Sequence, residues 1–253
     1  FPIEYLVMED SKDINNYMNR LGAAAKSAAG DLATVSSEVK NNALIYMSEA
    51  LDSRRNEILQ SNKVDLDKAK DKAIGDALID RLELTDERID GMISGLRIVA
   101  SLPDPVGEIE EMKPTPSGLK ISKMRVPLGV VGIIYESRPN VTADAAALCL
   151  KSGNACILRG GSEAILSNSL IAECLNQGLK RADLSENLIQ VVNTTDREAV
   201  TALLRMEQFI DVIIPRGGKG LVRLISEEAR IPVIKHLDGI CHVYIDKDAD
   251  LDE

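Results

Sequence analysis

The stretch Val126–Thr142 reads VPLGVVGIIYESRPNVT, and it decides the fold. Its centre, Val130–Tyr135, is a short apolar run that predicts a buried strand, and polar residues follow it at once. A helical pattern over Thr142–Lys151 comes next, and a second apolar run follows at Ala155–Arg159. Strand, helix and strand in this order predict a βαβ unit, in which a helix joins two parallel strands.

The same alternation continues to the end of the sequence. Further strands are predicted at Leu188–Val192, Val212–Pro215, Pro232–Ile234 and Val243–Ile245. Further helices are predicted from Ser162 to about Asn176, from a capping box at Thr195–Glu198, and from about Lys219 to Ala229. The first hundred residues read as helices instead, with starts at Ser36 and Thr85. We therefore predict an α/β fold, with a helical N-terminal part followed by a doubly wound, mostly parallel sheet.

Composition excludes several classes of protein. The 253 residues are 45% hydrophobic and 28% charged, which is typical of a globular chain rather than a disordered one. The formal charge of −10 disfavours nucleic acid and anionic membranes as partners. The longest apolar run, Val126–Ile134, is too short to span a bilayer, and Phe1–Tyr5 has no basic signal-peptide start. We expect a cytoplasmic protein with no nucleic-acid and no membrane partner.

The cysteines and histidines offer little for a metal site. The four cysteines form no C-x-x-C pair, and the sequence has two histidines. Cys149, Cys156 and Cys174 stand among apolar residues, so we expect them to be small buried side chains. Cys241 lies next to His242 and is harder to assign. We expect no metal.

Two predicted strands end in the same tripeptide, Arg-Gly-Gly, at residues 159–161 and 216–218. Ligands of parallel sheets bind beyond the carboxyl ends of the strands, where glycines admit a ligand and arginine pairs with phosphate. A phosphate-bearing ligand is therefore favoured over two tight turns with solvated arginines. The standard nucleotide loops are not satisfied, because Arg223 and Ile213 stand where they need glycine.

Four blocks of the sequence resemble one known family. Val126–Thr142 is similar to the signature of the γ-glutamyl phosphate reductases, the glutamate-5-semialdehyde dehydrogenases of proline biosynthesis, within the aldehyde dehydrogenase superfamily. Leu150–Gly161, Asp211–Gly220 and Lys235–His242 resemble further blocks of that family, in the same order and spacing. The resemblance implies an aldehyde-dehydrogenase-like fold with a cofactor domain, a catalytic domain and an oligomerisation arm.

The resemblance also divides the chain. Residues 9–112 correspond to the N-terminal helical part of the cofactor-binding domain, and residues 113–126 to a strand of the oligomerisation arm. Residues 127–253 correspond to the α/β nicotinamide-cofactor-binding domain, which leads toward a catalytic domain that is mostly absent. The family's nucleophilic cysteine belongs to a later block, with which none of the four cysteines aligns. We therefore expect no nucleophile in this chain and no activity of the chain alone. The oligomerisation arm of the family implies a homo-oligomer.

The reaction implied by the resemblance is the reduction of L-glutamyl 5-phosphate by NADPH to L-glutamate 5-semialdehyde, phosphate and NADP. A cysteine thiolate attacks the acyl phosphate, phosphate leaves, and hydride reduces the acyl group. Because the substrate is a kinase product, a functional link to glutamate 5-kinase is implied. Two alternatives stay open, namely a non-catalytic nucleotide-binding module and an acylating dehydrogenase that uses coenzyme A.

The resemblance assigns site residues by their position in the blocks. Arg159 matches the lysine that holds the adenosine ribose, and here we expect it to help with the 2′-phosphate of NADPH. His236 stands where hydrolytic relatives carry a general-base glutamate, although His236 and His242 are equally compatible with structural roles. The expected substrate or oxyanion contacts are Ser137, Arg138, Asn140 and His236. The expected cofactor-binding residues are Tyr135, Glu136, Arg159, Gly160, Gly161, Ser162, Arg216, Gly217 and Gly218.

Overall fold

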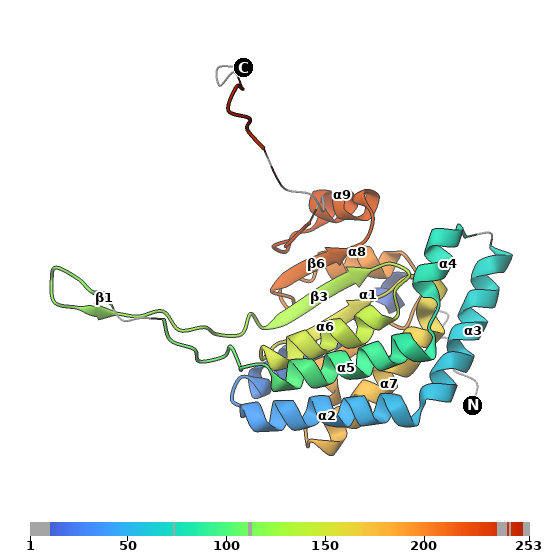
Figure 1. Cartoon of the computed structure of the whole chain (residues 1–253), viewed down its shortest axis with the longest axis horizontal. Helices are drawn as coiled ribbons and strands as arrows, with labels where there is room; N and C mark the ends of the chain where they lie inside the picture. The colour runs from blue at the N-terminus through green and yellow to red at the C-terminus, as the bar shows by residue number, and fades with distance from the viewer. Residues whose placement is uncertain (1–10, 73, 111–112, 237–241, 243, 250–253) are drawn as a thin grey trace.

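The computed structural model describes residues 11–72, 74–110, 113–236, 242 and 244–249. The N-terminal part is helical, as predicted (Figure 1). Its helices are α1 (Ser11–Leu32), α2 (Ser37–Ser53), α3 (Arg55–Asp71), α4 (Asp76–Leu82) and α5 (Asp86–Ser101). The side chains of Ser36 and Thr85 cap α2 and α5 by accepting hydrogen bonds from the third residue along, so both predicted starts are confirmed.

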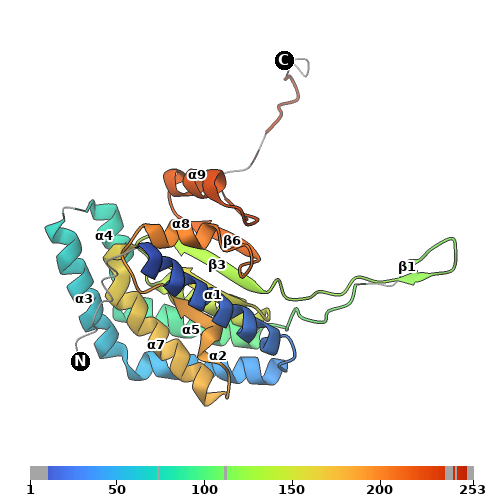
Figure 2. The ribbon, with the colours of Figure 1, turned by 180° about the vertical axis from the view of Figure 1, so that it is seen from behind.

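The second part is a parallel sheet of four strands in the order β5-β4-β3-β6. The strands are β3 (Val130–Tyr135), β4 (Ala155–Arg159), β5 (Ile189–Val191) and β6 (Val212–Arg216). The connecting elements are α6 (Asn140–Lys151), η1 (Ser162–Ala164), α7 (Ile165–Arg181), η2 (Glu186–Leu188), α8 (Glu198–Leu204) and α9 (Lys219–Glu228). Helices cover both faces, which confirms the predicted doubly wound architecture (Figures 1 and 2).

The layers are built by the apolar faces of the helices. Helices α6 and α7 pack directly on one face of the sheet, and α2, α3 and α5 form a further layer outside them. Helix α1 packs on the other face, and α8 lies beside α1 (Figure 2). All six residues of β3 are buried, and a Cβ on Gly132 would lie 2.5 Å from Cδ1 of Ile213 on β6. The glycine therefore admits the large neighbouring side chain.

Strand β3 is the point at which the chain changes direction across the sheet. It pairs with β4 on one side and with β6 on the other, although β6 comes last of the four in sequence. Open α/β sheets bind ligands at such a switch point, beyond the carboxyl ends of the strands. The ends of β3, β4 and β6 are therefore the place to look for a site.

Three sequence predictions need correction. Thr195 does not cap α8, because Asp196 Oδ1 accepts the Glu198 N–H at 2.8 Å. The stretch at Pro232–Ile234 makes a single parallel bridge, Ile213 with Val233, since the chain stays beside β6 for only this length. The strand predicted at Val243–Ile245 is not found within the described residues, where Tyr244 and Ile245 are exposed and form no strand. Val243 lies outside the described residues.

A long antiparallel hairpin projects from the body of the molecule (Figures 1 and 2). It contains β1 (Lys113–Pro114) and β2 (Lys120–Ile121), and a bridge joins Ile109 to Met124 nearer the body. The first leg of the hairpin therefore begins before residue 113, where the sequence placed the start of the arm. Five large apolar side chains on the hairpin are more than half exposed, namely Ile109, Leu119, Ile121, Met124 and Val126. Such a surface on a projection is typical of a segment that packs against another body.

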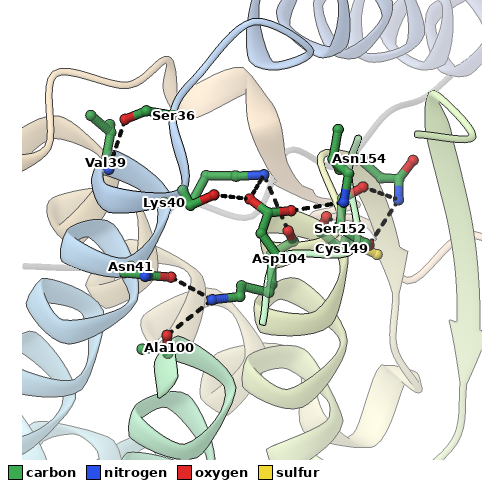
Figure 3. A network of polar contacts seen from close by, with 12 residues as sticks. Ser36, Val39, Lys40, Asn41, Ala100, Asp104, Cys149, Ser152 and Asn154 are labelled. Atoms are coloured by element: carbon green, nitrogen blue, oxygen red, sulfur yellow. Dashed lines mark hydrogen bonds and ion pairs between the residues drawn. The ribbon is translucent and has the colours of Figure 1, made fainter. Parts of the chain in front are cut away.

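A buried polar network anchors the root of this hairpin (Figure 3). Lys40 Nζ lies 2.5 Å from Asp104 Oδ2, and the Lys40 side chain is 2% exposed. Asp104 Oδ1 accepts the Val106 N–H at 3.0 Å, at the start of the outgoing leg. Asn154 Oδ1 accepts the backbone N–H groups of Leu128 and Gly129, at the end of the returning leg. The outgoing leg is thus tied to α2, and the returning leg to the turn between α6 and β4.

Within the described part of the chain, the helices are all too short or too polar to cross a bilayer.

Candidate cofactor and substrate site

Three cavities open at the carboxyl ends of the strands and beside them. We call the first, of about 560 Å³, the α8–α9 cavity. It is lined by Ile134, Tyr135, Glu136, Arg159, Gly161, Ser162, Glu163, Thr195, Arg197, Val200, Thr201, Leu204, Gly220, Leu221, Leu224 and Glu228. Its walls between the two helices are partly apolar, through Val200, Leu204 and Leu221. Apolar walls with a few charged groups at one end are typical of a ligand site.

Arg159 is the most unusual group in this cavity. Its Nη1 donates to Gly160 O at 2.9 Å, but its Nε is buried with no hydrogen-bond partner among the described residues. Burial lowers the pKa of Arg159, an effect that nearby Glu163 opposes and nearby Arg197 reinforces. A buried N–H without an acceptor costs free energy unless a ligand supplies the acceptor. Arg159 and Arg197 together therefore favour an anion at this end of the cavity.

The two glycines after Arg159 lie against side chains of the protein itself. A Cβ on Gly160 would lie 2.2 Å from Asn168 Nδ2, and one on Gly161 would lie 2.0 Å from Glu163 Oε1. The turn after β4 is therefore tight because of contacts within the protein. This agrees with the alternative in which Arg-Gly-Gly is a tight turn and not a ligand loop. Ser162 follows on the exposed side and lines the cavity.

We call the second cavity, of about 330 Å³, the β3–β6 cavity. It is lined by Arg81, Glu136, Arg138, Val141, Pro215, Arg216, Gly217, Gly218 and His236. Three guanidinium groups and one imidazole thus surround a single carboxylate, that of Glu136. This carboxylate accepts the Gly218 N–H at 2.9 Å, and a Cβ on Gly217 would lie 2.7 Å from its Cδ. The excess of positive groups suits a phosphate-bearing ligand.

Two of the predicted site residues turn their side chains into the protein. The hydroxyl of Tyr135 lies 2.7 Å from Thr142 Oγ1, its side chain is fully buried, and this burial raises its pKa. Ser137 has a positive φ of 37°, and both its N–H and its hydroxyl donate to Glu163 Oε1, at 2.9 and 2.5 Å. The Ser137 N–H and hydroxyl are therefore already bonded within the protein, and the predicted roles of both residues stay predictions.

We call the third cavity, of about 570 Å³, the α4–α6 cavity. It is lined by Asp80, Arg81, Glu83, Leu84, Glu87, Arg88, Gly91, Met92, Arg138, Asn140 and Asp144. Arg81 and Arg138 line this cavity and the β3–β6 cavity, so the two meet at these side chains. Asn140 Nδ2 donates to Asp144 Oδ2 at 2.9 Å, which places Asn140 on the α6 wall. The structure thus brings Arg138, Arg216 and His236 together and sets Asn140 beside them.

Sequence reasoning missed three residues of these cavities. Arg81 lies in a helix far earlier in the chain, and Arg197 stands inside the capping box that the sequence predicts. Glu163 belongs to none of the sequence motifs, although its carboxylate accepts both hydrogen bonds of Ser137. The position of Arg81 in the last turn of a helix is the one sequence signal that could indicate a site residue. Only the tertiary structure places it beside the end of β3.

The three described cysteines lie outside all three cavities. Cys149, Cys156 and Cys174 are buried, as predicted. A hydrogen bond with Cys149 and burial both raise the pKa of Cys156, and burial raises the pKa of Cys174 to about 11. Thiols of this kind are poor nucleophiles at neutral pH. Within the described residues, no group of three or more His, Cys, Asp or Glu side chains is placed to hold a metal ion.

Comparison with known proteins gives one family and several related structures. The model of the aldehyde dehydrogenase family matches residues 10–253. The γ-glutamyl phosphate reductase of Thermotoga maritima is 40% identical with a TM-score of 0.86, over 93% of this chain and 57% of that one. The reductase of Saccharomyces cerevisiae is 34% identical with a TM-score of 0.81, over 93% and 60%. These likenesses confirm the resemblance that the sequence blocks indicated.

A more distant structure shows the fold alone. The acetylating aldehyde dehydrogenase of Geobacillus thermoglucosidasius is 15% identical with a TM-score of 0.65, over 89% of this chain and 47% of that one. In each of these three comparisons the chain spans less than two thirds of the relative's length.

Proposed function

This chain belongs to the aldehyde dehydrogenase family, and on that premise we propose that its protein reduces L-glutamyl 5-phosphate to L-glutamate 5-semialdehyde in proline biosynthesis. NADPH is the hydride donor and phosphate is released. Similarity to the two γ-glutamyl phosphate reductases supports the assignment. The observation that carries it is the β3–β6 cavity, where Arg81, Arg138 and Arg216 gather at the switch point of a protein with a net charge of −10.

The α8–α9 cavity suits the coenzyme. The adenosine part of NADP would lie between the two helices, against their apolar side chains. Its 2′-phosphate would pair with Arg159 and Arg197, which supplies the acceptor that the buried Nε of Arg159 lacks. The pyrophosphate would pass Arg216, Gly217 and Gly218 at the start of α9. When bound, NADPH supplies hydride, and these residues orient it toward the β3–β6 cavity.

The β3–β6 cavity suits the phosphoryl end of the substrate. Arg138 and Arg216 provide guanidinium groups for phosphate oxygens, and His236 lies exposed on the same cavity. Without a carboxylate base in the place of His236, the site favours transfer to phosphate over transfer to water. We place the nucleophilic cysteine in the part of the protein that corresponds to the rest of the relatives' length.

Two other assignments make different predictions. A coenzyme A-dependent acylating dehydrogenase would share the fold, but its likeness to this chain stops at the fold. A non-catalytic nucleotide-binding module would bind NADP and turn over nothing. The clustered arginines favour a substrate with its own phosphate, and therefore the reductase.

The acceptor of the acyl group distinguishes these assignments. The assay measures NADP reduction by L-glutamate 5-semialdehyde on the natural full-length protein, with inorganic phosphate, with coenzyme A, or with neither. We expect turnover with phosphate alone. Turnover that needs coenzyme A would overturn the reductase assignment, and NADP binding without any turnover would support the module.

The projecting hairpin supports a further part of the proposal. Its exposed apolar side chains suit contact with a second copy of the chain, so we propose a homo-oligomer. Because an acyl phosphate is hydrolysed readily, a functional link to glutamate 5-kinase, which makes it, belongs to the same proposal. The three buried free thiols suit the cytoplasm, which we retain as the compartment.

A further inference from the structure

In the proposed arrangement the coenzyme does not enter the α4–α6 cavity, whose lining differs in charge from those of the other two cavities. Its charged lining carries both signs, with four carboxylates and three guanidinium groups around a small apolar floor of Leu84 and Met92. A cavity of one sign suits a simple anion or cation, and an apolar cavity suits an apolar ligand. A cavity with both signs suits a small molecule that carries both charges.

Some of these charges already have partners in the fold. Arg88 Nη1 donates to the backbone oxygens of Asp80 and Glu83, and its Nη2 donates to Asp80 Oδ1 at 3.0 Å. The Glu87 carboxylate bonds to its own N–H and to the Thr85 hydroxyl, which lowers its pKa at the start of α5. These three side chains, of Asp80, Glu87 and Arg88, therefore serve the turn between α4 and α5.

The remaining charges are available. Among the described residues, the side chains of Arg81, Arg138 and Glu83 have no hydrogen-bond or ion-pair partner, and Asp144 uses one carboxylate oxygen for Asn140. Two positive and two negative groups thus line one cavity without satisfying each other. Because Arg81 and Arg138 also line the β3–β6 cavity, the α4–α6 cavity continues directly from the proposed phosphoryl site.

We propose that the α4–α6 cavity binds the amino-acid end of the substrate, with Arg81 on the α-carboxylate and Asp144 and Glu83 on the α-ammonium group. This inference rests on the proposed function, which places the reacting end of the substrate in the β3–β6 cavity. The arrangement explains selection for an acyl group that carries an amino acid. It makes Arg81 a specificity-determining residue, although it lies far from the signature blocks in sequence.

The test is steady-state kinetics on the natural full-length protein, with NADP, saturating phosphate and L-glutamate 5-semialdehyde. We expect Arg81→Gln to lower kcat/KM for the semialdehyde roughly 10–100-fold, mainly through KM, since a charged hydrogen bond to the substrate is lost. KM for NADP should stay within about twofold, because the α8–α9 cavity is untouched. Glu83→Gln and Asp144→Asn should each weaken competitive inhibition by L-glutamate roughly tenfold but leave inhibition by glutarate, which lacks the ammonium group, unchanged.

Arg205→Gln is the matched control. Arg205 is exposed at the end of α8, across the sheet from this cavity, and its replacement should change neither constant. If Arg81→Gln melts like the wild type and keeps the wild-type KM for the semialdehyde, the inference is wrong. If Arg81→Gln does not fold, unchanged L-glutamate inhibition in Glu83→Gln and Asp144→Asn overturns it instead. A wild-type protein without phosphate-dependent turnover would refute the proposed function itself.

Discussion

The carboxylate of Glu136 accepts a hydrogen bond from the backbone N–H of Gly218 over 2.9 Å, which ties the end of β3 to the start of α9. The free N–H groups at the start of a helix favour an anion, and here a side chain of the protein supplies one. A pyrophosphate bound at Gly218 would lie beside the negatively charged carboxylate of Glu136. The contact orders the loop but opposes the ligand that we propose for it.

Replacing Glu136 by Gln therefore separates the two effects. Glutamine keeps an oxygen for the Gly218 N–H and removes the charge, so NADP should bind roughly 3–10-fold more tightly. Isothermal titration calorimetry at low and high salt measures this, with Glu207→Gln, an exposed glutamate beyond α8, as the control. Weaker binding by Glu136→Gln would mean that its charge serves the ligand rather than opposing it.

Arg159 and Arg197 should set the preference for NADP over NAD. Arg159→Gln and Arg197→Gln should each weaken NADP binding roughly 10-fold or more, because each removes a guanidinium from the 2′-phosphate. NAD lacks that phosphate, so its affinity should change little. Equal losses for both coenzymes in the same titrations would show that the two arginines hold another part of the molecule.

Asp104 should make stability depend on acid pH. Its burial would raise its pKa, but hydrogen bonds from Lys40, Ser37 and the Val106 N–H outweigh this and hold the pKa below its ordinary value of 3.8. A lowered pKa means that ionised Asp104 stabilises the fold above that ordinary value, and that this contribution is lost as pH falls through the folded-state pKa.

The corresponding variant is Asp104→Asn. It should lower the free energy of unfolding at pH 7 by roughly 2–4 kcal/mol, because Lys40 would be left buried without its counter-charge. Urea unfolding between pH 3 and pH 7 should also show a smaller pH dependence in the variant. Asp52→Asn, at an exposed ion pair with Arg55, should cost less than about 1 kcal/mol, and a similar loss in both variants would refute the account.

Gly178 on α7 packs directly against the backbone of α2. A Cβ there would lie 2.6 Å from the backbone N of Met47, which cannot move aside as a side chain can. Gly178→Ala should therefore lower the free energy of unfolding by roughly 1–3 kcal/mol. Gly91→Ala, inside α5 with open space around it, should instead raise it by up to about 1 kcal/mol through helix propensity. Thermal melts of the two variants should shift in opposite directions.

The hairpin should be needed for assembly but not for folding. Leu119 and Ile121 are 64% and 56% exposed, so the double change Leu119→Ser and Ile121→Ser should leave the melting temperature of a monomer unchanged. Sedimentation velocity should show a smaller species than the wild type. The control is Ile98→Ser, on the exposed side of α5. An unchanged sedimentation coefficient in the double variant would place the subunit contact elsewhere.

Burial explains which elements could be predicted from the sequence. Strands β3 and β4 have the bounds that their apolar runs predicted, because both are buried and polar or glycine residues flank them. Pro232–Ile234 is similarly apolar but makes a single bridge to β6. The number of residues that pair depends on the neighbouring strand, which the local sequence does not reveal. Thr195 failed as a cap because Asp196 competes for the same N–H.

The site was predictable only where it follows strand ends. Arg159 and Arg216 are the last residues of two strands that both pair with β3, so their positions at the same edge of the sheet follow from parallel topology. Arg81 reaches the same edge from α4 through the packing of the helical layer, which no local pattern in the sequence specifies. Similarly, the sequence did not indicate that Tyr135 would turn into the core and bond to Thr142.

The central claim is that the coenzyme lies across the carboxyl ends of β3, β4 and β6. A crystal structure of the natural full-length protein with NADPH tests it most directly. We expect the adenosine between α8 and α9, the 2′-phosphate on Arg159 and Arg197, and the pyrophosphate at Arg216–Gly218. Coenzyme bound elsewhere, with the Nε of Arg159 still without an acceptor, would contradict the account.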